Sequence, residues 1–177
     1  MPIPPIRHLQ PGDAERWQMG AIPGFPAFVQ PVVHALLQAR DEINTIMATG
    51  DDALLWQRPA GLASPAFHLQ HTKGFLDRLF TYAAGESLSA EQLGYLAGEG
   101  AEYATTREAL LNSLSEQFLA CFEKLFRVQP DQLTAERLVG RKKIPSTMIG
   151  LYFHAAEHTM RHTGQLLTTW KILTASR

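Results

Sequence analysis

Apolar residues recur every three to four positions along four long stretches of the chain, and this spacing predicts four amphipathic helices. They are expected at about residues 28–48, 64–84, 105–128 and 146–174. A shorter helical segment is expected at 87–97. Strand-like alternation and hairpin dipeptides are essentially absent. The pattern therefore predicts an all-α protein, built as a four-helix bundle.

Residues that start and stop helices fix the boundaries of this scheme. Ser64 and Pro65 supply a capping side chain and a proline at the first helical position of the second helix. Prolines at positions 2, 4, 5, 11, 23 and 26 predict an irregular arm over residues 1–26. Residues 131–145 are expected to be a connector without strands. We expect one domain spanning residues 1–177, with the arm as its first segment.

Composition narrows the class of protein. The chain is 45% hydrophobic and has a formal net charge of -1, which argues against a surface devoted to nucleic acid or to anionic membranes. No apolar run is long enough to span a membrane, and the first residues lack a signal-peptide core. Cys121 is the only cysteine and lies in an apolar run, so we expect a buried, inert thiol and a cytoplasmic protein.

Histidine spacing supplies the candidate chemistry. In YFHAAEHTMRHTGQ, residues 152–165, His154, His158 and His162 are four residues apart. At about 100° per residue, His162 falls within the apolar arc, His158 at its edge and His154 on the polar border. A histidine pair at this spacing can offer two imidazoles to one cation.

A metal site needs further ligands, and the only other histidine cluster is His68 and His71 on the second helix. If the second and last helices run antiparallel, both clusters lie near the same end of the bundle. The alternatives are ordinary half-buried histidines or a proton relay, which also needs proximity but no open coordination position.

Two segments carry a resemblance to a known family: SPAFHLQHTKGFLDRLFTYAAGESLS at 64–89 and FHAAEHTMRHTGQLLTTWKIL at 153–173. The chain resembles the DinB-like (DinB/YfiT) family of four-helix bundles. That resemblance implies a divalent metal, zinc or nickel, held by His158, His162 and one histidine of the second helix. Position favours His71, whereas the helical wheel places His68 nearer the apolar arc, so His68 is the rival. His154 and Gln165 are expected to line the pocket or support the ligands.

The functional expectation follows from the resemblance and from the ligand set. Three imidazoles leave a tetrahedral ion one open position, as in catalytic zinc sites. Family members include transferases that use bacillithiol, mycothiol or glutathione, and a thiol-dependent maleylpyruvate isomerase. We therefore expect a metal-dependent enzyme that activates a low-molecular-weight thiol or water on a small-molecule substrate, of thiol S-transferase or hydrolase type.

The alternative is a non-catalytic, metal-binding or dimerising stress-related helical protein. The sequence assigns no catalytic residue. A homodimer is expected from the family and from the apolar first helix.

Overall fold

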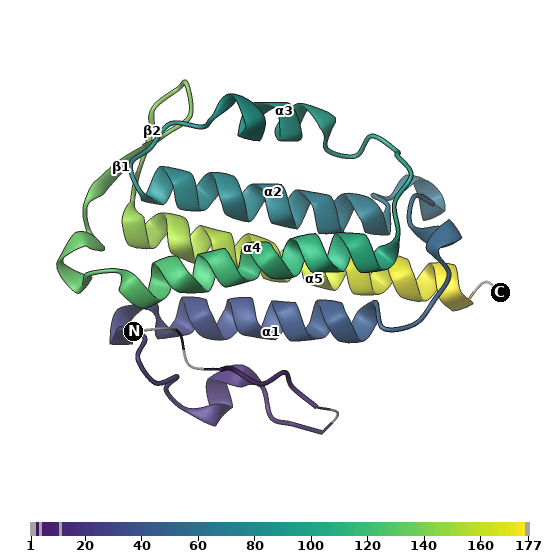
Figure 1. The fold of residues 1–177 in the computed structure, drawn as a ribbon, viewed down its shortest axis with the longest axis horizontal. Coiled ribbons are helices and arrows are strands. Elements are labelled where there is room, and N and C mark those ends of the chain that lie inside the picture. Colours follow the sequence, from purple (N-terminus) through teal and green to yellow (C-terminus); the bar gives the residue numbers. More distant parts are fainter. Residues whose placement is uncertain (1–2, 4, 11, 176–177) are drawn as a thin grey trace.

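The computed structural model describes residue 3, residues 5–10 and residues 12–175. Four long helices lie side by side in it, and α3 packs outside them (Figure 1). The helices are α1 (Gln30–Ile46), α2 (Pro65–Ala83), α3 (Ala90–Gly98), α4 (Arg107–Arg127) and α5 (Met148–Ala175). Short 3-10 helices are η1 (Arg16–Met19), η2 (Ala27–Val29), η3 (Asp52–Leu54), η4 (Pro59–Gly61) and η5 (Pro130–Gln132). The predicted all-α class is confirmed.

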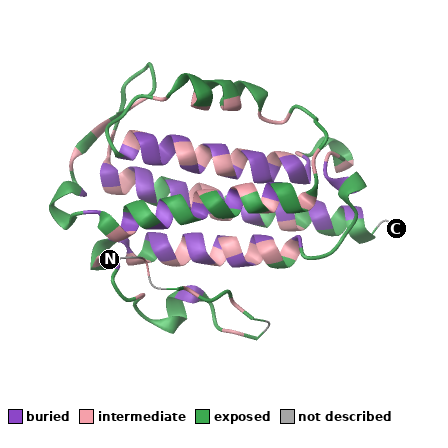
Figure 2. Ribbon diagram, in the orientation of Figure 1, coloured by how far each residue is buried: buried purple, intermediate pink, exposed green. Residues whose placement is uncertain are grey.

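The hydrophobic core lies between the long helices. α5 packs against α1 and α2, and α4 packs against α2 and α1. Buried residues gather on the sides of these helices that face one another, whereas α3 has no buried residue (Figure 2). Each long helix contributes side chains that are at most 1% exposed: Leu36, Phe80, Phe118 and Leu166. Burying one such side chain contributes about 1.5–3 kcal/mol.

Capping side chains start three of the helices. Ser64 Oγ accepts a hydrogen bond from Phe67 N, and Pro65 occupies the first turn of α2. Ser89 and Gln92 form a reciprocal capping box on α3. Thr106 Oγ1 accepts from Ala109 N at the start of α4. These bonds satisfy backbone donors that have no partner inside the helix.

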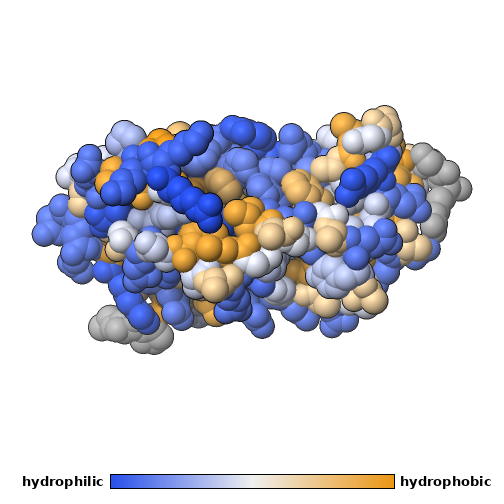
Figure 3. All heavy atoms as spheres, turned by 90° about the horizontal axis from the view of Figure 1, so that it is seen from above, coloured by the Kyte–Doolittle hydropathy of each residue, from blue (hydrophilic) through white to orange (hydrophobic). Residues whose placement is uncertain are grey.

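α3 runs back along the outer side of α2, so that α4 begins at the end of the bundle where α2 begins (Figure 1). Seen from above, the face that carries α3 is mainly hydrophilic, with separate apolar patches (Figure 3). Leu93 and Leu96 of α3 are each 44% exposed. Among the described helices, none combines the length and apolarity needed to cross a membrane.

The expectation that residues 131–145 lack strands was wrong. Strands β1 (Glu136–Val139) and β2 (Ile144–Thr147) form an antiparallel hairpin in which Glu136 pairs with Thr147. Each strand has only four residues, too few for alternation to emerge from the sequence. Arg137 Nε donates to Ala83 O at 2.6 Å, so the hairpin satisfies a carbonyl at the C-terminal end of α2.

The described part of residues 1–26 contains one 3-10 helix, η1, and a buried carboxylate of α1 is among the groups that bind this arm. Asp41 accepts hydrogen bonds from Arg16 Nε at 2.9 Å and from His8 Nδ1 at 2.8 Å. Arg16 is 6% exposed, although it lies in the arm. Three of the arm's prolines, at positions 2, 4 and 11, lie outside the described residues.

Candidate metal centre

Three imidazole rings from two helices meet beside the core. His71 belongs to α2, whereas His158 and His162 belong to α5. Each offers one ring nitrogen, and the three nitrogens lie within 4.8 Å of one another. Ring centroids are 4.5 Å apart for His158 and His162, 4.6 Å for His71 and His162, and 5.2 Å for His71 and His158. This group could hold a metal ion.

The antiparallel register of α2 and α5 produces this meeting. Going along α2 toward its C-terminus, His68 contacts His162, His71 contacts His158, and Phe80 contacts Tyr152. Because residues one turn apart share a face of a helix, the four-residue step from His158 to His162 presents both rings to α2. The spacing in the sequence thereby becomes proximity in space.

Side chains outside the three-histidine group form a hydrogen bond with one nitrogen of two of these rings. Glu99 Oε2 lies 2.8 Å from His71 Nδ1, and His68 Nδ1 lies 2.9 Å from His162 Nδ1. A carboxylate only accepts, so His71 donates from Nδ1, and Nε2 is the nitrogen of this ring that faces α5. That Nε2 lies 2.9 Å from His158 Nε2. Metal-binding histidines commonly have the other ring nitrogen engaged in this manner.

Burial favours the uncharged form of the two α5 rings in the cluster. Burial, reinforced by neighbouring imidazoles, lowers the pKa of His158 and of His162 from 6.5 to about 4. The same causes lower the pKa of His68 to about 4, and His68 is 3% exposed. Neutral rings are the form that binds a cation, because protonation removes the lone pair.

Aromatic side chains form the walls of the cluster. Phe67, one turn before His71 on α2, stacks on the His71 ring at a centroid distance of 5.2 Å and an interplanar angle of 10°. Phe75, one turn after it, stacks on His158 at 3.9 Å. These contacts restrict ring rotation and shield the imidazoles from water on two sides.

The family of the chain follows from a sequence comparison. The sequence model of the DinB superfamily matches residues 35–166, which is 132 of the 177 residues. The chain belongs to the DinB superfamily. The matched range contains all three histidines of the cluster and the residues that contact them. A search of curated proteins found no significant match.

The DinB fold places the other predicted site residues around the cluster. His68 lies behind His162 rather than in the three-nitrogen group, which contains His71. The His154 side chain is 50% exposed, and its ring centroid lies 5.6 Å from that of His158, at the rim. Gln165 is exposed and lines a cleft of about 450 Å³ together with His68. Binding of a metal by His71, His158 and His162 stays a prediction.

Sequence reasoning missed Glu99 and the role of Arg78. Arg78 Nη1 donates to Glu99 Oε1 at 2.6 Å, and both side chains are less than 10% exposed. Burial opposes ionisation of Glu99, but the hydrogen bonds from His71 and Arg78 outweigh it and lower the pKa of this carboxyl. Glu99 follows α3 in a segment without periodicity, so no spacing in the sequence connects it to His71.

The donor set of this DinB protein fits a divalent transition metal. Three imidazole nitrogens suit zinc, nickel or copper, whereas calcium and magnesium prefer oxygen ligands. The described cluster has supporting hydrogen bonds on His71 and His162, and its rings are partly exposed to solvent. Buried Nδ1 of His158 has no hydrogen-bond partner among the described residues, so Nε2 is its engaged nitrogen.

Proposed function

We propose that this DinB protein binds zinc or nickel through His71, His158 and His162, and uses it in a thiol S-transferase or hydrolase reaction on a small molecule. The convergence of three imidazoles at one point carries the proposal. When bound, such an ion lowers the pKa of a coordinated water or thiol and so supplies a nucleophile at neutral pH.

The protein's own residues have distinct tasks in this proposal. His71, His158 and His162 bind the ion, while Glu99 and His68 orient two of the rings. Phe67 and Phe75 keep water from the faces of the rings that they cover. The division of tasks is that of catalytic metal sites, in which supporting groups fix the ligands and one coordination position stays open.

A cleft beside the cluster offers room for the substrate. It measures about 450 Å³, a size typical of small-molecule sites, and reaches His68. Its lining combines apolar, amide and cationic groups, among them Leu62, Arg161 and Gln165. We propose that the reacting small molecule lies here, next to His68, which contacts the ligand His162.

The thiol of the proposed reaction comes from a small molecule rather than from the protein. Cys121 on α4 is 0% exposed, and burial raises the pKa of its thiol to about 12. A thiol in this state does not form the nucleophilic thiolate at neutral pH. A separate low-molecular-weight thiol is therefore required if the reaction is thiol-dependent.

An activity screen tests the proposed reaction. Protein loaded with Zn²⁺ or Ni²⁺ is incubated with low-molecular-weight thiols and electrophilic or hydrolysable substrates, and turnover is compared between wild type and His162→Ala. We expect turnover to require His162. The matched control is His34→Ala, which replaces a half-buried histidine of α1 that lies outside the cluster and whose Nε2 contacts Gly20 O. Turnover that survives the loss of His162 would exclude the proposed mechanism.

A further inference from the structure

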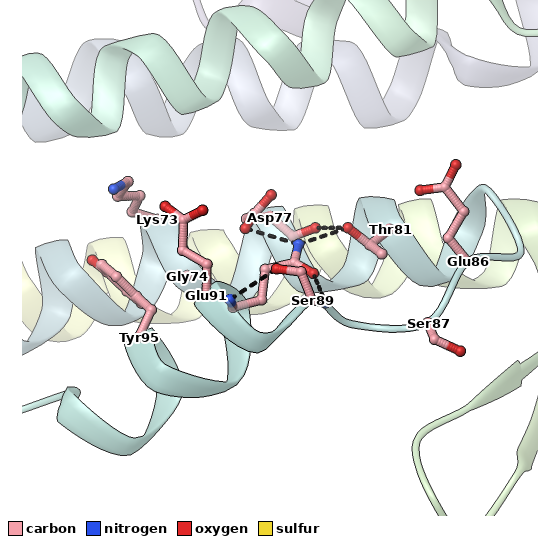
Figure 4. A pocket seen from close by; sticks show the side chains of 10 residues that line it. Lys73, Gly74, Asp77, Thr81, Glu86, Ser87, Ser89, Glu91 and Tyr95 are labelled. Carbon is pink, nitrogen blue, oxygen red and sulfur yellow. Dashed lines mark hydrogen bonds between the residues drawn. The ribbon is translucent and has the colours of Figure 1, made fainter.

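Polar contacts from Gln92 and Tyr95 hold α3 against α2. Gln92 Nε2 donates to Asp77 Oδ2 at 2.9 Å and to Thr81 Oγ1 at 2.8 Å. Tyr95 Oη donates to Gln70 O at 3.1 Å. Figure 4 shows Ser89, the N-cap residue of α3, near Asp77 and Thr81 of α2, and Tyr95 of α3 nearer to Lys73. These contacts fix α3 against the helix that carries His71.

The residue that follows α3, Glu99, places its carboxylate against the His71 ring. Glu99 Oε2 accepts from His71 Nδ1, while Glu99 Oε1 accepts from Arg78 Nη1. The Glu99 side chain is 6% exposed and that of Arg78 is 9% exposed. One oxygen is thus held by a buried guanidinium and the other is directed at the imidazole. Gly100 N also donates to Gln70 Oε1 at 3.1 Å, which anchors the segment after Glu99.

Gly74 provides the space that this carboxylate occupies. A Cβ atom at position 74 would overlap the Glu99 carboxylate and would lie 2.6 Å from Tyr95 Cε1 and 2.7 Å from Arg78 Nη1. Gly74 lies inside α2, where glycine costs about 1 kcal/mol relative to alanine. By contrast, a Cβ atom at Gly94 of α3 would meet nothing within 4 Å. The absence of a side chain at 74 is what lets α3 approach.

We propose that Glu99 is a positioning residue for the His71 ligand, and that α3 serves to hold it there. The bond to Glu99 holds an N–H on Nδ1 of His71 and directs Nε2 of that ring toward His158. A carboxylate that fixes a ligand's tautomer and ring orientation strengthens metal binding. This role rests on the metal binding proposed above.

Zn²⁺ affinity of the full chain, measured by competition with a chromophoric chelator, tests the role. We expect Glu99→Ala to bind Zn²⁺ about 10–100-fold more weakly than wild type. Glu99→Gln keeps a carbonyl acceptor and should recover part of this loss. Glu102→Ala, which removes an exposed carboxylate three residues further on, should leave the affinity unchanged. Equal affinities in wild type and Glu99→Ala would overturn the positioning role.

The tautomer of His71 in the metal-free protein separates a positioning role from a merely structural one. If Glu99 only stabilised the fold, its removal would not change which ring nitrogen of His71 carries the proton. Long-range ¹H–¹⁵N spectra distinguish an imidazole protonated on Nδ1 from one protonated on Nε2. We expect the Nδ1–H form in wild type and a mixture in Glu99→Ala. An unchanged tautomer would overturn the role even if stability changed. Absence of Zn²⁺ binding by wild type would instead overturn the proposed function, and the role with it.

A pair of glycine substitutions tests the close approach of α3 without touching the carboxylate. Gly74→Ala should displace Glu99 and weaken Zn²⁺ binding, whereas Gly94→Ala should bind as wild type does. Circular dichroism establishes that both variants are folded before the comparison. Equal Zn²⁺ affinities in a folded Gly74→Ala variant and in Gly94→Ala would contradict the requirement for glycine at position 74.

Discussion

Replacing Asp41 with alanine removes the carboxylate that holds the N-terminal arm on α1. Asp41 Oδ2 accepts from Arg16 Nε at 2.9 Å, and Asp41 Oδ1 accepts from Arg40 Nη2 at 2.8 Å. The side chains of Asp41, Arg16 and Arg40 are 2%, 7% and 12% exposed. The substitution therefore leaves two guanidinium groups largely buried and without their anion.

The magnitude follows from this burial. Removing one partner of a buried ion pair costs about 3–5 kcal/mol, because the remaining charge stays desolvated. Arg16 Nη2 retains a hydrogen bond to Arg7 O, so the lower part of this range is expected for Asp41→Ala. Glu42→Ala is the matched control, since the neighbouring carboxylate accepts from Gln38 within one helix turn. Such a bond contributes about 0.2–0.5 kcal/mol.

Two measurements check the result. Urea unfolding gives the free energy of unfolding from the midpoint and slope, and limited trypsin digestion reports access to the peptide bond after Arg16. We expect Asp41→Ala to lose about 3 kcal/mol and to be cut rapidly after Arg16. A loss equal to that of Glu42→Ala, with unchanged cleavage, would refute the account of how the arm is held.

Two further predictions concern buried titratable groups. Cys121 is buried and the pKa of its thiol is raised to about 12, so it should resist a thiol-specific reagent in the native protein and react after denaturation. Rapid labelling of the native protein would contradict this burial. Burial and neighbouring imidazoles lower the pKa of His158 and His162 to about 4, so NMR titration of the metal-free protein should give midpoints near that value rather than near 6.5. Because the unfolded chain binds these protons first, the free energy of unfolding should fall as pH decreases from about 6.5 to 4, and midpoints above 6 would contradict this.

The helices were predictable because their signals are local. Apolar spacing and the Ser64 and Ser89 caps depend on residues within a few turns, and the structure has both caps. The β1–β2 hairpin was not predicted, because two four-residue strands give almost no alternation of apolar and polar residues. Pro145 in β2 also argues against a strand. Its contact with α2, through Arg137 and Ala83, joins residues 54 positions apart.

For the histidines, too, only the local part of the arrangement was predictable from the sequence. The four-residue step between His158 and His162 is a local signal, and the helical projection correctly separated them from the exposed His154. Which of His68 and His71 joins them depends on how α2 and α5 are rotated against each other, which spacing alone does not determine. Glu99 reaches His71 only because α3 packs back on α2 over Gly74, a tertiary contact without a sequence pattern.

Metal analysis of protein purified without a histidine tag tests the central claim most directly. Mass spectrometry of the dialysed wild type should find about one zinc or nickel ion per chain, as expected for a single three-histidine site. His158→Ala and His162→Ala should lose that ion, whereas His34→Ala should retain it. An unchanged metal content in His158→Ala would contradict the assignment of this cluster as the metal centre.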